Sequence, residues 1–491
     1  MSKLVISKLF LYRYRFLIGY TLLGLAFVAL VFLLPTLSPA GLSSLEQRSA
    51  VASYNLHFSS ITSGDLIDLP YHVLQKICIL LFGFSTYTIK LPSIIIGLLL
   101  GFLIILLLNR WFKSNVALLA SILTVLSTPF LYLAGSGTPL IMLVFWPTLL
   151  LWLGSKIQGD KSTSPVFSLI FALSLLLSIY TPHLIYLVIF IIIFAIWNPH
   201  LRYTIKTLPR LPMLITLLII LAGFGIWLTN LISSSSVALS LFFARDFSFA
   251  NFIKNIHTGL TPFFSFSSST VGVFLSPMFS LAGVALAATG LFSTRKGFFA
   301  SRNAIASCFI VFAVVLSGLT PDSSLLLILP FAILTAHGLR YLLEKWYGLF
   351  PLNPYARIFA IFPLSILLAL MLVPNLTHFI YGYRYSPAVA NEFSSDLQLV
   401  QTKLAENTYL YLPKDTLDYH FYNVYEDRHH LISIISDFNS MNPGIKYDIA
   451  TLGYQTDLNL PENYHLSRII TSPKSDNSDR IYIYKYISSS N

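Results

Sequence analysis

Long runs of apolar residues fill the chain up to about residue 381, and short polar or basic stretches separate them. A helix needs about 20 apolar residues to span the hydrocarbon core of a bilayer. By that measure the pattern predicts about eleven spans, namely Phe16–Leu34, Leu91–Asn109, Val116–Leu133, Leu140–Leu153, Val166–Tyr180, His183–Ile196, Leu211–Leu231, Phe274–Phe292, Ala304–Leu319, Ser324–Leu343 and Ile358–Pro374. The run Val73–Leu81 is too short to span, so it predicts a helix at the membrane surface or packed on the bundle.

The pattern changes after residue 381, where polar and acidic residues appear and apolar runs shorten. NEFSSDLQLVQTKLA has helical spacing, whereas TYLYLP, IKYDIATLG, HLSRIITS and RIYIYKYI are short and rich in β-branched and aromatic residues, which is typical of strands. We therefore predict a mainly α polytopic membrane helix bundle, residues 1–381, followed by a small soluble α/β domain, residues 382–491.

Composition supports a membrane protein, because 55% of the 491 residues are hydrophobic and only 10% are charged. The net charge of +11 is uneven: 22 basic and 7 acidic residues precede residue 382, and 9 basic and 13 acidic residues follow. The cations lie in short loops between apolar runs, which indicates membrane orientation rather than nucleic-acid binding. The two cysteines, Cys78 and Cys308, predict neither a disulfide framework nor a thiolate metal site.

With the N-terminus placed inside, 17 of the membrane half's cations lie in inner segments and 5 in outer ones. This bias predicts a cytoplasmic N-terminus in a multi-pass plasma (inner) membrane protein. The first apolar run shows no convincing cleavage site, so we expect a retained anchor helix. An odd number of spans then puts the C-terminal domain on the extracytoplasmic side.

The outer loop 41–90 concentrates the titratable side chains of the membrane half. It holds three of the seven carboxylates found before residue 382, and carboxylates near lipid are rare and tend to face a cavity or water. A second long outer segment, Ile232–Thr270, predicts an interfacial helix and a loop. The loop 41–90 is therefore the predicted active-site loop, and its charged and imidazole groups are Glu46, Arg48, His57, Asp65, Asp68, His72, Lys76 and Lys90.

Three stretches carry a resemblance to a known family. They are LSSLEQRSAVASYNL, the long run DLPYHVLQKICILLFGFSTYTIKLPSIIIGLLLGFLIILLLNRWFKSNVALLASIL, and LPFAILTAHGLRYLLEKW. The chain resembles bacterial membrane glycosyltransferases of the GT-C class, related to the protein O-mannosyltransferases and aminoarabinose transferases. The resemblance implies a sugar donor linked to dolichyl or polyprenyl phosphate and a cell-envelope acceptor (lipid, glycan or protein) on the outer face.

The resemblance also implies roles for particular residues. Glu46 matches the catalytic acid, which would act as general base on the acceptor hydroxyl. The leaving phosphate is anionic and needs cations, for which Arg48, Lys76 and Lys90 are candidates. The full set of predicted substrate-binding residues is Arg48, Asp65, Asp68, His72, Lys76 and His183.

The chain departs from the family at three places. Asp68, Leu69 and Pro70 stand where the family often has Lys-Pro-Pro, Leu140 replaces a second Asp, and Leu45-Glu46 replaces Asp-Glu. These departures leave the type of donor and the use of a divalent metal ion open. No metal ligands and no cofactor are assigned, and the His429-His430 pair lacks further ligand spacing.

Each site residue also has a structural interpretation, and Glu46 could cap the loop helix. For the whole protein, two other functions compete with a transferase. One is a catalytically degenerate member that binds polyprenyl lipid or a partner enzyme. The other is a lipid transporter or flippase, which predicts internal repeats and midplane charges that this chain lacks. For the remaining residues the structural interpretations are turn solvation for Asp65 and Asp68, interfacial packing for His72, bundle packing for His183 and snorkelling for Lys90.

Overall fold

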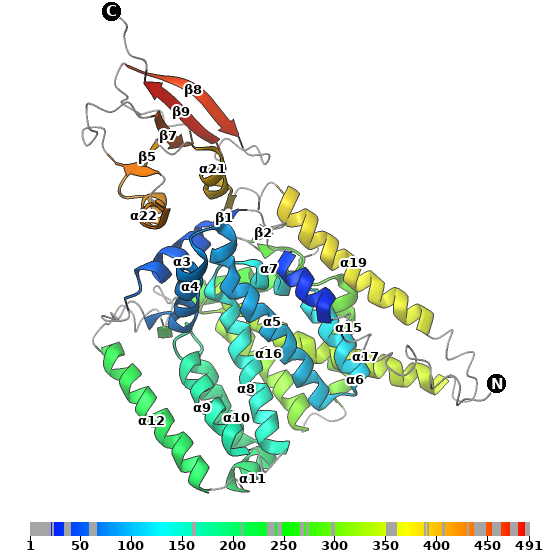
Figure 1. Ribbon diagram of the computed structural model, residues 1–491. Helices are drawn as coiled ribbons and strands as arrows, with labels where there is room; N and C mark the ends of the chain where they lie inside the picture. The colour runs from blue at the N-terminus through cyan, green and yellow to red at the C-terminus, as the bar shows by residue number, and fades with distance from the viewer. Residues whose placement is uncertain are drawn as a thin grey trace, which may run out of the picture.

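The computed structural model shows a helix bundle with a mixed β-sheet at one end, which confirms the predicted fold class (Figure 1). The residues that it describes are 21, 24–33, 41–57, 66–159, 164–207, 210–232, 241–242, 248–265, 270–271, 274–295, 300–349, 361–386, 389, 392–404, 408–429, 432–436, 448–453, 463–471 and 480–486.

Helices occupy most of the described part of the predicted spans. In chain order, the helices of the bundle are α3 (Ser44–Asn55), α4 (Leu69–Phe82), α5 (Thr86–Trp111), α6 (Ser114–Val125), α7 (Thr128–Gly135), the 3₁₀ turn η2 (Pro139–Ile141), α8 (Met142–Gly159), α9 (Ser164–Ser178), α10 (Ile185–Trp197), α11 (Pro199–Thr207), α12 (Arg210–Ile232), α14 (Phe249–Phe264), α15 (Leu281–Thr294), α16 (Ser301–Ser317), the 3₁₀ turn η4 (Pro321–Leu327), α17 (Ile328–Leu349) and α19 (Ile361–Tyr385). A further apolar helix covers Gly24–Leu33.

Four helical stretches among the described residues are long and apolar enough to cross a membrane. They are Thr86–Trp111, Pro139–Ile157, Pro321–Gly348 and Ser365–Tyr385. The pair α6 and α7 makes a fifth if it is one span, although the two helices meet at 64° where a single span, Val116–Leu133, was expected. Shorter apolar helices occupy the other predicted positions, so the total of about eleven spans stays a prediction.

One predicted span begins too early. The span Phe274–Phe292 was expected to be continuous, but residues 274–275 form β3, which pairs with β2 (Thr270–Val271), and α15 starts only at Leu281. The interruption has a local cause, because Pro277 lacks the N–H that a helix interior requires. Ser280 then caps α15 by accepting from the backbone N–H of Gly283.

The two non-spanning helices expected near the outer surface are present. Helix α4 buries Tyr71, Gln75 and Cys78 while leaving Leu81 and Phe82 about two-thirds exposed. Helix α14 likewise exposes Phe249 and Phe264. An element that buries one face and exposes apolar side chains on the other suits the membrane interface.

The C-terminal part folds around a five-stranded sheet with the order β6-β5-β7-β9-β8. Strands β5, β6 and β7 run parallel, whereas β9 is antiparallel to β7 and β8. Sequence analysis missed helix α22, which connects β5 to β6 as parallel strands require. The bounds are β4 (Phe393–Ser394), α21 (Asp396–Lys403), β5 (Thr408–Tyr411), α22 (Leu417–His429), β6 (Ser433–Ile435), β7 (Asp448–Leu452), β8 (Tyr464–Thr471) and β9 (Arg480–Tyr486).

The part of the chain that forms this sheet contacts the loop 41–90 through a pair of short strands and a buried apolar cluster. Strand β1 (Leu42–Ser43) pairs with β4, and one buried apolar cluster holds Leu42, Phe84 and Phe421 together. The rings of Phe84 and Phe421 lie 5.1 Å apart, and Gln401 Nε2 donates to the Phe84 carbonyl at 2.9 Å. The predicted boundary at residue 381 falls inside α19, which continues to Tyr385, and the division into domains stays a prediction.

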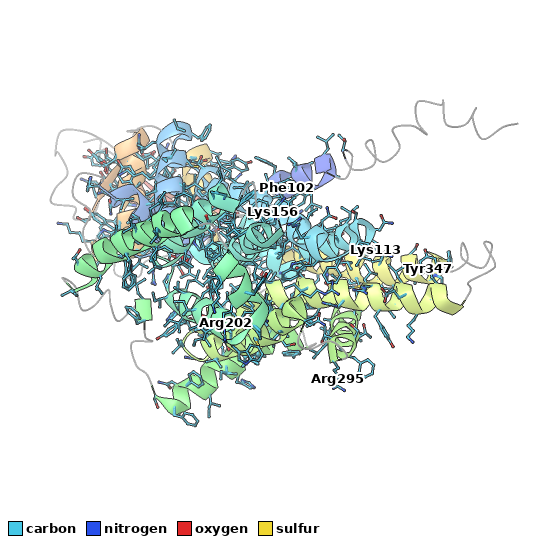
Figure 2. All side chains as sticks on the ribbon, turned by 90° about the horizontal axis from the view of Figure 1, so that it is seen from below. Phe102, Lys113, Lys156, Arg202, Arg295 and Tyr347 are labelled. Carbon is cyan, nitrogen blue, oxygen red and sulfur yellow. The ribbon has the colours of Figure 1, made fainter. Side chains whose placement is uncertain are left out.

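Figure 2 views the molecule from the end of the bundle opposite the sheet and labels Lys113, Lys156, Arg202 and Arg295, one from each of four predicted inner loops. The orientation of the chain in the membrane stays a prediction.

Candidate functional site

Glu46 lies in the first turn of α3, at the end of the bundle that faces the sheet (Figure 1). Ser43 is the N-cap: its Oγ accepts from the Glu46 N–H at 3.3 Å, and Glu46 Oε2 accepts from the Ser43 N–H at 2.7 Å. This reciprocal pair is a capping box, which satisfies backbone donors that the helix itself cannot pair. The capping role considered from the sequence is therefore present.

Glu46 also reaches outside its own helix. Its side chain is fully buried, Oε1 accepts from the backbone N–H of Gly137 at 2.6 Å, and Lys90 Nζ lies 3.9 Å from the same oxygen. Lys90 is fully buried too, so the expectation that it snorkels to the interface is wrong. A buried cation next to a buried carboxylate offsets part of the desolvation cost of both charges.

A buried amide, Gln75 of α4, connects the elements around Glu46. Gln75 Oε1 accepts from Ser49 Oγ at 2.8 Å and from Ser53 Oγ at 2.6 Å. Its Nε2 donates to the carbonyls of Ile89 at 2.9 Å and Gly137 at 3.2 Å. All four hydrogen-bonding positions of the amide are used, and sequence analysis missed this residue because the bonds are long-range.

Three predicted substrate-binding residues lie on α3 or contact it from α4. The Nζ of Lys76 donates to the carbonyls of Tyr54 and Leu56 at the C-terminal end of that helix, where a cation is favoured. His72 Nδ1 lies 2.7 Å from Ser53 Oγ, and Arg48 is exposed on the surface of α3. Asp65 lies outside the described residues.

Two other predicted residues, Asp68 and His183, meet at a second location. Both line a cavity of about 130 Å³. Burial raises the pKa of the Asp68 carboxyl to about 7. Near pH 7 Asp68 is therefore divided between its two protonation states.

Sequence analysis missed the other polar residues of this cavity, which are Thr181, Thr320, Asp322 and Ser323. Asp322 was recognisable as one of the seven carboxylates of the membrane half, but nothing local in the sequence links it to Asp68. Leu140, where the family often has an Asp, lines the same cavity, so Asp322 brings a carboxylate there from a different element. Segment 136–141 connects the two locations, because Gly137 binds Glu46 while Pro139 and Leu140 line the cavity.

These residues do not form a recognisable metal centre. Within the part of the chain that the structure describes, no group of three or more His, Cys, Asp or Glu side chains is arranged to hold a metal ion. The arrangement instead offers carboxylates, an imidazole and hydroxyls, which suit hydrogen bonding to an uncharged polar ligand.

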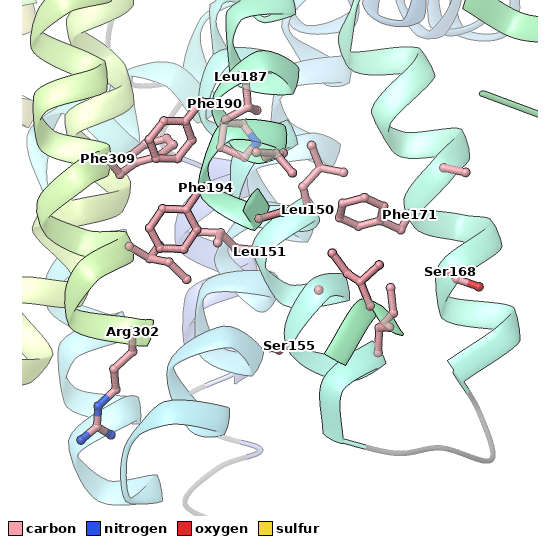
Figure 3. Close-up of a pocket in the computed structure, with 18 of the residues that line it drawn as sticks. Leu150, Leu151, Ser155, Ser168, Phe171, Leu187, Phe190, Phe194, Arg302 and Phe309 are labelled. Carbon is pink, nitrogen blue, oxygen red and sulfur yellow. The ribbon is translucent and has the colours of Figure 1, made fainter. Parts of the chain in front are cut away.

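A larger cavity of about 380 Å³ lies at the other end of the bundle. Figure 3 shows its mainly apolar lining, with Leu150, Phe190, Phe194 and Phe309 among the labelled side chains. Trp111 at the end of α5 lines it, whereas Lys90 near the start of α5 contacts Glu46. At a rise of 1.5 Å per residue these two positions are roughly 30 Å apart, so this cavity is separate from the carboxylate sites.

Comparisons with known proteins agree with the sequence resemblance. Residues 70–228 match the family described as dolichyl-phosphate-mannose-protein mannosyltransferase. ArnT from Cupriavidus metallidurans, solved bound to undecaprenyl phosphate and in the apo state, has a similar structure. Each comparison has a TM-score of 0.52 and 14% identity, and covers 95% of this chain and 98% of that chain.

A more distant similarity is to the Archaeoglobus fulgidus oligosaccharyltransferase, with a TM-score of 0.47 and 12% identity over 84% of this chain and 63% of that one. No curated protein sequence matches this chain. The resemblance drawn from the sequence is confirmed: the chain has the fold of the GT-C class membrane glycosyltransferases, and residues 70–228 match the mannosyltransferase family within it.

Proposed function

We propose that this protein is a membrane glycosyltransferase that moves a hexose or pentose from a polyprenyl-phosphate carrier to a cell-envelope acceptor on the outer face. The observation that carries the proposal is the family match over residues 70–228, because this stretch contains Lys90, the segment 136–141 and His183. The similarity to ArnT, which was solved with undecaprenyl phosphate, supports a polyprenyl-phosphate carrier.

Glu46 stays the predicted general base. A hydroxyl is a weak nucleophile, and a carboxylate within hydrogen-bond reach raises its reactivity while the sugar–phosphate bond breaks. In this structure Glu46 is fully buried, and its Oε1 accepts from Gly137 N–H. An acceptor hydroxyl therefore reaches the carboxylate only if the elements that cover it move, and the segment 136–138 is one of them.

Sugar transfer from a panel of radiolabelled polyprenyl-phosphate sugars to envelope fractions tests the proposal. The full-length protein in lipid nanodiscs is compared with Glu46→Gln, with and without a divalent metal ion. Loss of a general base lowers the rate by about a hundredfold to ten-thousandfold, so we expect that loss in Glu46→Gln and full activity in the exposed control Glu344→Gln. Full activity in Glu46→Gln would show that Glu46 is not the general base.

A binding measurement separates the transferase from a degenerate lipid-binding member. The departures at Asp68 and Leu140 favour that second function, because both positions lack the residue that the family often carries. If the wild-type protein binds polyprenyl phosphate but transfers sugar from no donor in the panel, it is a lipid-binding protein and not a transferase.

A further inference from the structure

Two residues that line the smaller cavity, Asp68 and His183, have a strained backbone conformation that hydrogen bonds hold in place. Among the described residues, Asp68 and His183 are the non-glycine residues with positive φ, at 53° and 63°. A left-handed backbone costs free energy in a side-chain-bearing residue, and such residues cluster at ligand sites. Both are fixed by backbone bonds, from Asp68 N–H to the Tyr180 carbonyl at 2.9 Å and from His183 N–H to the Leu241 carbonyl at 3.0 Å.

Three buried polar side chains that line this cavity have atoms without a hydrogen-bond partner among the residues that the structure describes. They are Asp68 Oδ1, Thr181 Oγ1 and His183 Nε2, on residues that are 9%, 2% and 5% exposed. A buried polar atom that stays unpaired destabilises the fold, so three such atoms around one cavity indicate a polar ligand. His183 Nδ1 faces Thr320 Oγ1 at 3.5 Å, which leaves Nε2 for that ligand.

The charge of the lining decides which part of a glycosyl lipid fits. Asp68 and Asp322 contribute carboxylates, and no lysine or arginine is among the described residues that line the cavity. A phosphate group would be repelled there, whereas sugar hydroxyls can donate to carboxylates and form hydrogen bonds with an imidazole. The volume of about 130 Å³ is well below that of a typical drug-sized pocket and suits a single small ring.

We propose that the cavity lined by Asp68, Thr181, His183 and Asp322 is a subsite for the hydroxyl groups of one sugar ring. The inference rests on the proposed glycosyltransferase function and names the residues that would recognise the sugar. It assigns Asp68, the residue that replaces the family's lysine, to sugar binding and not to phosphate binding. The ring can belong to the donor lipid or to the acceptor, since both present the same hydroxyl chemistry.

Ligand binding to the full-length protein in nanodiscs tests this subsite. The three probes are polyprenyl phosphate without sugar, polyprenyl-phosphate sugars, and methyl glycosides that represent an acceptor. The variants are Asp68→Asn, Asp322→Asn and the exposed control Glu344→Gln. Because a hydrogen bond to a charged group contributes about 1.5–3 kcal/mol, each cavity variant should lose about tenfold to a hundredfold in affinity for a sugar-bearing probe.

The sugar-free lipid is the internal control for folding, and its affinity should change less than twofold in every variant. A selective loss for the sugar lipid identifies the donor sugar, and a selective loss for the methyl glycoside identifies the acceptor sugar; both support the subsite. Equal loss for the sugar-free lipid and the sugar lipid overturns it, because the variants then disturb the whole fold. Unchanged affinity for both sugar-bearing probes overturns it as well.

Failure of the subsite and failure of the proposed function give different results. If Asp68→Asn and Asp322→Asn keep wild-type transfer with an unchanged KM, the protein is a transferase and the subsite is wrong. If no donor supports transfer but the cavity variants still lose glycoside binding, the subsite stands and the transferase assignment is wrong.

Discussion

At the scale of single residues, the pair Glu46 and Lys90 is the unusual feature. Two fully buried charges lie 3.9 Å apart, and Glu46 also accepts from the backbone N–H groups of Ser43 and Gly137. Removing one partner of a buried pair leaves an uncompensated charge, which is far more costly than removing both. This asymmetry separates a structural effect of a Glu46 substitution from a catalytic one.

The stability of three variants, Glu46→Gln, Lys90→Met and the double variant, should reveal that asymmetry. Glu46→Gln leaves Lys90 buried without its carboxylate, so we expect a loss of about 3–5 kcal/mol in the free energy of unfolding. The double variant Glu46→Gln/Lys90→Met should recover part of that loss. Denaturant unfolding in a fixed detergent measures both, and strictly additive losses would show that the two side chains do not interact.

Asp68 should make stability depend on pH. Its pKa rises from 3.8 in the unfolded chain to about 7 in the folded protein, so the neutral carboxyl is favoured on folding. The stabilisation is fully present below about pH 4 and is lost as the pH rises through 7. At pH 8, Asp68→Asn should therefore be more stable than wild type by up to about 4 kcal/mol, with little difference near pH 4.

Thermal unfolding of the two proteins at a series of pH values checks this expectation. Asp322 and His183 line the cavity in both proteins, so the comparison isolates Asp68. An identical pH dependence in wild type and Asp68→Asn would show that the Asp68 carboxyl is not desolvated.

At the scale of elements, the segment 136–141 organises the site. It follows α7 and precedes α8, binds Glu46 through Gly137 and lines the cavity through Pro139 and Leu140. Gly137 allows the close approach: a Cβ atom there would lie 2.9 Å from both Ile89 Cγ2 and the Ile89 carbonyl oxygen. The contact with a backbone atom leaves little room for adjustment.

Gly137→Ala should consequently cost about 1–3 kcal/mol in stability and displace the N–H that binds Glu46. Gly225→Ala in α12 is the matched control, since a Cβ at that position meets nothing within 4 Å. Alanine favours a helix over glycine by roughly 1 kcal/mol, so the control should be neutral or stabilising. A tolerated Gly137→Ala would show that the segment can move away from α5.

Sequence periodicity predicted the presence of helices better than their ends. The bend between α6 and α7 and the start of α15 at Leu281 depend on Pro129 and Pro277, which a hydropathy run does not register. Helix α22 was missed although Phe421, Val424 and Tyr425 have helical spacing and are buried, because polar and charged residues interrupt the apolar pattern of LDYHFYNVYEDRH. Hydropathy alone therefore located elements but not their boundaries.

The candidate site was predictable only where a residue was unusual for its surroundings. Glu46, Asp68 and His183 are polar groups in an apolar chain, and the structure gives each a buried place. Gln75 and Asp322 matter through partners far away in the sequence, so no local pattern could identify them. For the same reason the sequence could not show that Lys76 caps α3 instead of facing a cavity.

At the scale of the whole molecule, the sheet domain rests on the loop that carries Glu46 (Figure 1). Phe84 packs against Phe421 and Tyr425, with ring centroids 5.1 and 6.4 Å apart. Arg428 lies over the ring of Tyr54, and Gln47 hydrogen-bonds to the Asp418 carboxyl. The domain therefore supports α3 from the side opposite the bundle.

Phe421→Ala should weaken that support. Truncating a buried phenylalanine costs about 3–5 kcal/mol, and the loss should appear as faster proteolysis within both α3 and the sheet domain. Leu466→Ala on β8, a half-exposed side chain outside this contact, is the control. Cleavage confined to the sheet domain would mean that α3 holds its place without it.

The pairing of β1 with β4 also sets an order of assembly. It joins Ser43 to Phe393, which are separated by roughly 350 residues. The strand β4 is synthesised long after α3, so α3 lacks its last neighbours until almost the whole chain has been made. Such long-range contacts form late in folding. A nascent chain released before Phe393 should insert its membrane helices yet leave α3 open to protease, so the Glu46 region is the last part of the molecule to mature.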